Sequence, residues 1–114
     1  MSKLTIQWCK DFKNSVPFFV RMNGKEIGII KRGEQIQCDV TNSDFELSFI
    51  PKAPSFFGWK VLEIKARTLS DGDLFIELSV LYRNKPMMAS QLHIDSSQNI
   101  FIVSEEHNKK YKKQ

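Results

Sequence analysis

The chain has 114 residues, 41% of them hydrophobic, and its 17 basic and 13 acidic residues give a formal net charge of +4. This length predicts a single domain whose core is large enough to fold without disulfides or metals, and the composition excludes a disordered chain. The sequence has no apolar run long enough for a membrane-spanning helix, and its polar N-terminal residues exclude the apolar core of a secretory signal. We therefore expect a cytoplasmic protein, the alternative being that a signal was removed before this numbering begins.

The first half of the chain predicts short strands, because apolar and polar residues alternate in each segment. Two turn signals, Asn23-Gly24 and Arg32-Gly33, lie on either side of a β-prone run. Asn-Gly is the strongest short hairpin signal, because a type I′ turn needs positive φ at both central residues. The core-facing residues expected in this half are Leu4, Ile6, Trp8, Val16, Phe18, Val20, Met22, Ile36, Cys38, Val40, Phe45, Leu47 and Phe49.

The second half predicts two long strands over 59–68 and 73–83, with an Asp71-Gly72 hairpin signal between them. Two final strands are expected on either side of the polar turn 95–99, and no segment shows the periodicity of a helix. Short strands separated by turns every 8–12 residues are typical of sandwiches and barrels. The fold class predicted is all-β: an antiparallel β-sandwich or partly open barrel of about eight to nine short strands.

Several apolar residues fall opposite the core face assigned to their strands. Either these strands are buried on both sides or the register is misassigned, or else one outer face carries an apolar patch of the kind that binds partners. The residues concerned are Phe19, Ile30, Phe75, Leu81, Phe101 and Val103.

The charge pattern divides the chain into a single β-sandwich domain over 1–104 and a basic, flexible tail over 105–114. Lysine-rich termini are usually solvated ends without a function of their own. The alternative is that the tail contacts nucleic acid or an anionic membrane. The residues that would make this contact are Lys109, Lys110, Lys112 and Lys113.

The two cysteines are expected to remain reduced, which agrees with a cytoplasmic protein. Cys9 alternates outward and Cys38 inward, so their Cβ atoms are not expected to reach disulfide distance. Cys38 is expected to be a buried thiol that packs as a small hydrophobic residue.

Catalytic and metal-binding signatures are absent from the sequence. His93 is expected to face solvent from a strand and His107 to lie in the tail, and neither has a motif partner. The acidic turns around 71–73 and 39–44 leave calcium as a minor alternative, although neither turn supplies the six to eight oxygens that calcium requires. We expect no enzyme activity, no cofactor and no metal.

The connection over 51–59 is the main candidate site, because three aromatic residues follow two prolines in a segment expected to be exposed. Proline lowers the entropy lost on binding, and aromatic rings supply contact area. The alternative is that the aromatic residues fold back and close one end of the sandwich. The binding residues predicted are Phe56, Phe57 and Trp59, with Lys52 and Lys60 supplying charge.

The segments 19–28, 31–34 and 45–49 resemble a PEGA-type module, a small bacterial β-domain with an Asn/Asp-Gly-Lys turn followed by a Gly-Glu turn. The resemblance covers about residues 16–50, and the Trp8-Cys9 pair before the hairpin is similar to one in small uncharacterised bacterial proteins. Lys31-Arg32-Gly33-Glu34 stands where the family has its Pro-Glu-Gly-Ala run. The resemblance implies an interaction domain without catalysis, which in this family is usually associated with the cell surface or envelope.

Together these features predict a non-catalytic binding module that engages a protein or carbohydrate partner through its aromatic loop. One alternative is a peripheral binder of anionic membranes or nucleic acid that uses the loop and the lysine tail. The other is a structural domain that forms homo-oligomers by pairing of edge strands.

Overall fold

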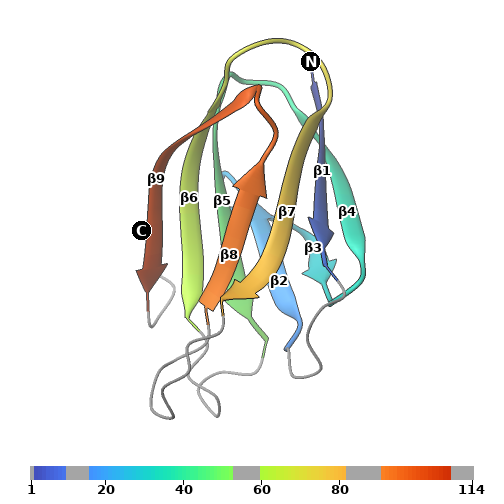
Figure 1. Cartoon of the computed structure of the whole chain (residues 1–114), viewed down its shortest axis with the longest axis vertical. Coiled ribbons are helices and arrows are strands. Elements are labelled where there is room, and N and C mark those ends of the chain that lie inside the picture. Colours follow the sequence, from blue (N-terminus) through green and yellow to red (C-terminus); the bar gives the residue numbers. More distant parts are fainter. Residues whose placement is uncertain (1, 10–15, 53–59, 82–90, 109–114) are drawn as a thin grey trace.

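A computed structural model describes residues 2–9, 16–52, 60–81 and 91–108, and every element in this part of the chain is a β-strand (Figure 1). The strands form two sheets that pack face to face, so the predicted all-β sandwich is confirmed. The nine strands are β1 (Ser2–Trp8), β2 (Phe18–Met22), β3 (Lys25–Ile30), β4 (Gln35–Val40), β5 (Asp44–Pro51), β6 (Val61–Thr68), β7 (Leu74–Leu81), β8 (Gln91–Ser96) and β9 (Ile100–Asn108).

The four-stranded sheet has the order β4-β1-β7-β8, and the five-stranded sheet has the order β3-β2-β5-β6-β9. Neighbouring strands are antiparallel except β1 and β7, which run parallel. The chain passes from β1 directly to the other sheet, so β1 has no hairpin partner next to it in sequence. Its two neighbours, β4 and β7, are supplied by later parts of the chain.

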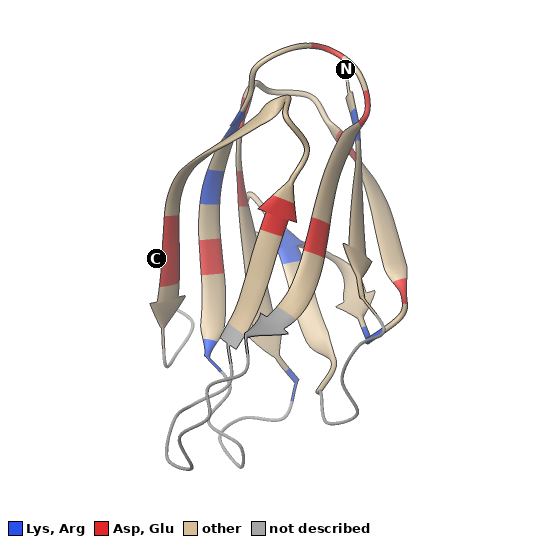
Figure 2. Cartoon of the chain, viewed as in Figure 1, with Lys and Arg blue, Asp and Glu red and all other residues tan. Residues whose placement is uncertain are grey.

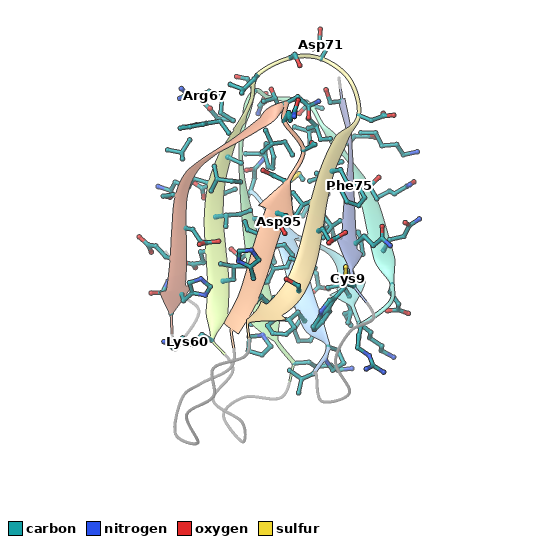
Figure 3. All side chains as sticks on the ribbon, viewed as in Figure 1. Cys9, Lys60, Arg67, Asp71, Phe75 and Asp95 are labelled. Atoms are coloured by element: carbon teal, nitrogen blue, oxygen red, sulfur yellow. The ribbon has the colours of Figure 1, made fainter. Side chains whose placement is uncertain are left out.

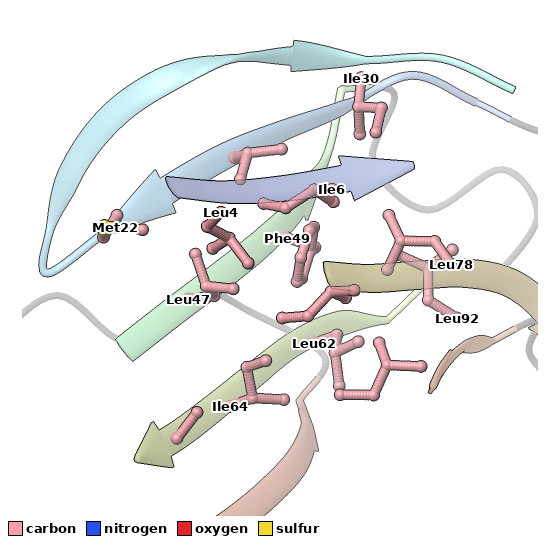
Figure 4. Close-up of a cluster of buried hydrophobic side chains, with 14 of the residues drawn as sticks. Leu4, Ile6, Met22, Ile30, Leu47, Phe49, Leu62, Ile64, Leu78 and Leu92 are labelled. Atoms are coloured by element: carbon pink, nitrogen blue, oxygen red, sulfur yellow. The ribbon is translucent and has the colours of Figure 1, made fainter. Parts of the chain in front are cut away.

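The core lies between the sheets and is formed by the residues that alternation placed inward (Figure 4). Trp8 and Phe18 belong to different sheets, and their rings meet edge to face with centroids 5.5 Å apart. Full burial of one such apolar side chain contributes about 1.5–3 kcal/mol, so the two sheets are held together chiefly by this layer. Figure 4 labels Leu4, Ile6, Met22, Ile30, Leu47, Phe49, Leu62, Ile64, Leu78 and Leu92, all buried.

Glycine chemistry explains both early turns. Asn23 and Gly24 have φ angles of 51° and 81° and connect β2 to β3, as the hairpin signal predicted. Gly33 has a φ of 84°, and its N–H donates to the Trp8 carbonyl at 2.9 Å. The Trp8 N–H donates in turn to the Glu34 carbonyl at 3.0 Å. Gly33 and Glu34 together therefore oppose Trp8 in a β-bulge, which turns the chain into β4.

Two expectations differ from the structure. The domain was expected to end at residue 104, but β9 continues through Asn108, where its backbone pairs with Val61 of β6. His107 therefore lies in a strand and not in the tail. Ile30 is fully buried, because its pairing with Phe18 aligns it with the inward face of β2.

Candidate binding surface

The sandwich has two ends, which we name the Lys60 end and the Asp71 end after residues labelled in Figure 3. At the Lys60 end β1, β3, β5, β7 and β9 finish and β2, β4, β6 and β8 begin. Each internal or C-terminal stretch outside the described residues therefore joins the described chain at the Lys60 end. These stretches are 10–15, 53–59, 82–90 and 109–114.

The four stretches that join the Lys60 end carry most of the charge imbalance of the sequence. They contain eight of the 17 basic residues and one of the 13 acidic residues, which leaves nine basic and twelve acidic residues in the described part. The basic residues are Lys10, Lys13, Arg83, Lys85, Lys109, Lys110, Lys112 and Lys113, and the acidic residue is Asp11. The acidic residues of the described part are instead spread over both sheets, and two of them, Asp71 and Asp73, lie in the connection between β6 and β7 at the Asp71 end (Figure 2).

The described part contains two of the predicted site residues, Lys52 directly after β5 and Lys60, which is labelled in Figure 3, directly before β6, both at the Lys60 end. Lys52 is exposed, and its N–H donates to the Pro17 carbonyl at 2.8 Å, which holds the end of β5 beside the start of β2. Lys60 is half-buried immediately before β6. The other predicted residues lie outside the described part: Phe56, Phe57, Trp59, Lys109, Lys110, Lys112 and Lys113.

An apolar row, which we call the outer apolar row, crosses the outer face of the five-stranded sheet next to Lys52. Phe19 of β2 pairs with Ile29 of β3 on one side and with Ile50 of β5 on the other, so the three side chains share one face. Ile29 is 39% exposed, and Phe19 and Ile50 are half-buried. Val61 continues the row on β6, one position beyond the Phe49–Leu62 pair. Val61 is 3% exposed although it is not part of the core cluster between the sheets.

The rest of this outer face is polar and largely satisfied by its own contacts. The Nδ2 of Asn108 donates to a carboxylate oxygen of Glu63 at 3.0 Å and lies 3.5 Å from one of Glu106, the residue that pairs with Glu63. Arg67 donates to Asp44 at 2.8 Å, and this contact raises the pKa of the guanidinium. In the described part of the chain, by contrast, neither Lys52 nor Lys60 forms an ion pair. The charge of these two lysines is therefore available to a partner.

Three further outward apolar residues on the described strands do not extend the outer apolar row. Phe75 lies on the four-stranded sheet (Figure 3), and Phe101 pairs with Arg67 on β9 toward the Asp71 end. Val103 is the extra residue of the β9 bulge, where the register with β6 shifts. These three residues belong to separate places, whereas Phe19 belongs to a continuous row.

The two histidines of the chain both lie in described strands, each near a carboxylate of its own strand. His93 Nε2 lies 3.5 Å from Asp95 on an exposed strand face, as expected, and His107 Nε2 lies 3.9 Å from Glu105 on β9. No three His, Cys, Asp or Glu side chains within the described ranges are placed to hold a metal.

Cys38 faces inward as predicted, but it is half-buried at the edge of the core and not enclosed by it. Burial, with a smaller contribution from Asp39, raises the pKa of its thiol. In the described ranges neither Cys38 nor Cys9 forms a disulfide.

The chain matches no protein-family model, and searches of curated proteins and of solved structures also found no match. Across the described residues, no helix has the length and apolarity needed to cross a membrane.

The sequence identified Phe19 as an apolar residue on an outward face but missed its partners. Ile29 and Ile50 lie on different strands, and only the pairing of β2 with both β3 and β5 brings them beside Phe19. One feature of the sequence indicates apolar residues on the outer face, namely two adjacent apolar residues on one strand, as in Ile29-Ile30 and Phe49-Ile50.

Proposed function

We propose that this chain is a non-catalytic binding module and that its Lys60 end engages an acidic protein surface. The observation that carries the proposal is the outer apolar row, formed by Phe19, Ile29 and Ile50, directly beside Lys52. Apolar side chains surrounded by a polar rim are the usual composition of a protein-binding surface, and a few central residues supply most of the affinity.

The charge around the row determines which partners the surface fits. Lys52 and Lys60 have no acidic partner in the described chain, so they can pair with carboxylates of another protein. Complementary rim charges mainly accelerate encounter and exclude wrong partners, while apolar contact sets the dissociation rate. In this proposal Phe56, Phe57 and Trp59 extend the apolar contact, because their segment starts after Lys52 and ends before Lys60.

A second candidate is a peripheral binder of an anionic membrane or of nucleic acid. It is supported by the position of Asn108 at the Lys60 end, since the lysine-rich residues that follow start from the same end as the 53–59 connection. The two candidates differ in salt dependence, because binding to a polyanion falls steeply as counterions compete.

The proposal also places the module in a reducing compartment such as the cytoplasm, where protein thiols remain reduced. A location in the cell envelope, which the PEGA resemblance implies, is the alternative. Labelling the thiols of the protein in intact cells distinguishes the two locations.

The test compares two charge-matched variants in capture from lysate of the source organism, followed by calorimetry with each captured protein after purification. Lys52→Glu/Lys60→Glu reverses charge at the Lys60 end, and Lys3→Glu/Lys25→Glu makes the same change in net charge from exposed positions at the opposite end. We expect the first variant to lose about tenfold or more in affinity and the second to bind like the wild type. A third variant, Ile29→Ser, should bind weakly without any change in charge.

Equal losses in both charge variants would show that only net charge matters, and the proposed surface would be wrong. The membrane and nucleic-acid candidates are tested with phosphatidylserine vesicles and with single-stranded RNA at two salt concentrations. Strong binding to either that disappears at the higher salt would replace the acidic protein with that polyanion as the ligand.

A further inference from the structure

The sandwich has four edge strands, and they are protected to different degrees. Bulges or register shifts interrupt β3 against β2 and β9 against β6, and such irregularities discourage further pairing. β8 and β4 are regular, because six consecutive residues of each pair with the neighbouring strand without any shift. β8 follows residues 82–90, which lie outside the described part of the chain, whereas described residues flank both ends of β4. Its sequence, Gln35-Ile36-Gln37-Cys38-Asp39-Val40, has no proline, lysine or glycine and a single charge. β4 is therefore a regular edge without the features that natural proteins use to block pairing.

The hydrogen bonds at the bulge show which β4 groups face away from the molecule. Trp8 exchanges backbone hydrogen bonds with Gly33 and Glu34. Since bonded and non-bonded positions alternate in an antiparallel pair, the backbone groups of Ile36, Cys38 and Val40 point to β1. The N–H and C=O groups of Gln35, Gln37 and Asp39 therefore point outward at the edge.

We propose that β4 pairs antiparallel with β4 of a second copy of this chain, about a twofold axis through Gln37. In this register Gln37 faces Gln37 of the second copy, and Gln35 faces its Asp39. All three outward-pointing residues of each strand are then in hydrogen-bonding positions, whereas a shift by two residues in either direction leaves one of them unmatched. The two four-stranded sheets join into one sheet of eight strands.

The side chains of β4 are self-complementary in this register. Asp39 meets a glutamine amide and not a second carboxylate, so no like charges face each other. On the inner side, half-buried Ile36 meets Cys38 of the second copy, and each covers apolar surface that the monomer leaves partly exposed. A single strand pair is a small interface, so the expected dimer forms weakly and depends on concentration.

This pairing goes beyond the proposed function, because it uses a different surface. β4 lies at the edge of the four-stranded sheet, whereas the outer apolar row crosses the five-stranded sheet. The twofold axis is perpendicular to the joined sheet. The Lys60 ends of the two copies therefore face in opposite directions. The dimer is therefore a bivalent module that can bridge two partner molecules.

The register is tested by cysteine crosslinking of the full chain in a Cys9→Ala/Cys38→Ala background. Hydrogen-bonded strand partners have Cα atoms about 5.5 Å apart, which a disulfide can span. We expect Gln37→Cys to form a crosslinked dimer on mild oxidation. Gln35→Cys alone should not crosslink, but it should crosslink when mixed with Asp39→Cys. No crosslink with Gln37→Cys, or equal crosslinking by Gln35→Cys alone, would overturn the proposal.

A charge-reversal experiment in the otherwise natural sequence tests the pairing by sedimentation across a wide concentration range. Gln37→Lys places two lysines opposite each other and should weaken the dimer about tenfold, as should Gln37→Glu with two carboxylates. An equimolar mixture of the two variants should associate at least as well as the wild type. A wild-type chain that stays monomeric at every concentration, or a mixture that does not associate, would contradict β4 pairing.

Discussion

The turn at Asn23 allows two contributions to stability to be separated with three substitutions. Asn23 has a left-handed φ of 51°, and its side-chain Oδ1 accepts a hydrogen bond from the Glu46 N–H at 2.9 Å. Its own N–H donates to the Glu46 carbonyl, also at 2.9 Å, which ties the β2–β3 hairpin to β5. Asn23 therefore supplies both an unusual backbone conformation and a link between strands.

The three substitutions keep or remove different parts of this arrangement. Asn23→Gly keeps the left-handed φ but loses the side-chain hydrogen bond, which contributes about 1 kcal/mol. Glycine also makes the unfolded chain more flexible, which lowers the free energy of unfolding by about 1 kcal/mol or less. Asn23→Ala loses the same hydrogen bond and must also place a Cβ in the left-handed region, at about 1–2 kcal/mol. Asn23→Asp keeps an oxygen acceptor and tolerates the conformation. The expected destabilisation is about 2–3 kcal/mol for Ala, about 1.5 for Gly and below about 0.5 for Asp.

The measurement is urea denaturation, with midpoint and slope recorded for each variant. The slope should not change, because the same surface is exposed on unfolding, and the midpoint alone should move. If alanine is tolerated as well as glycine, the left-handed conformation does not strain a side chain at this position. If aspartate costs as much as alanine, the bond to Glu46 contributes nothing, and the reasoning is refuted.

Further predictions concern the core, the surface and the thiol. Trp8→Ala, at a position 1% exposed, should cost about 3–5 kcal/mol of unfolding free energy in the same assay, and a small loss would mean that the sheets close over the gap. Arg67→Ala should leave the thermal midpoint nearly unchanged, because its pair with Asp44 is exposed on both sides, and a large drop would show that the pair matters more than exposed pairs do. Alkylation of Cys38, followed by mass spectrometry against pH, should have a midpoint above the ordinary value of 9.0. Because the folded pKa is raised, the stability contributed by this thiol is complete below pH 9.0 and declines as the pH rises further. Cys38→Ala should lack that decline, and an identical decline in both proteins would exclude the thiol as its cause.

The binding surface could be predicted only in part from the sequence. Lys52 and Lys60 were identified because they adjoin an aromatic segment, and the structure places both at one end of the sandwich. Ile29 and Ile50 were not identified, because a strand pattern shows which residues share a face of one strand but not which strands are neighbours. The sequence likewise does not predict that the four basic or aromatic stretches all join the chain at the Lys60 end, since this depends on the direction of every strand.

The C-terminal boundary of the last strand could also not be predicted from the sequence alone. Glu105, Glu106 and His107 are polar in sequence and were expected to belong to a solvated tail. In the structure they extend β9, because β6 offers backbone partners as far as Val61. A boundary predicted from composition is therefore too early. Backbone hydrogen bonds with a neighbouring strand stabilise a polar segment even when it has no apolar pattern.

Alternation and turn chemistry were enough to predict the strands, their inward faces and the main turns, as at Leu4, Ile6 and Trp8 or at Asn23-Gly24. These properties are local, because side-chain alternation and positive φ depend on residues adjacent in the chain. The tertiary structure decided that β1 runs parallel to β7, that β4 is left as a regular edge and that the outer apolar row lies beside Lys52. Those properties depend on how two sheets cover each other's apolar faces, and that choice among distant strands is made by the packing of the whole chain.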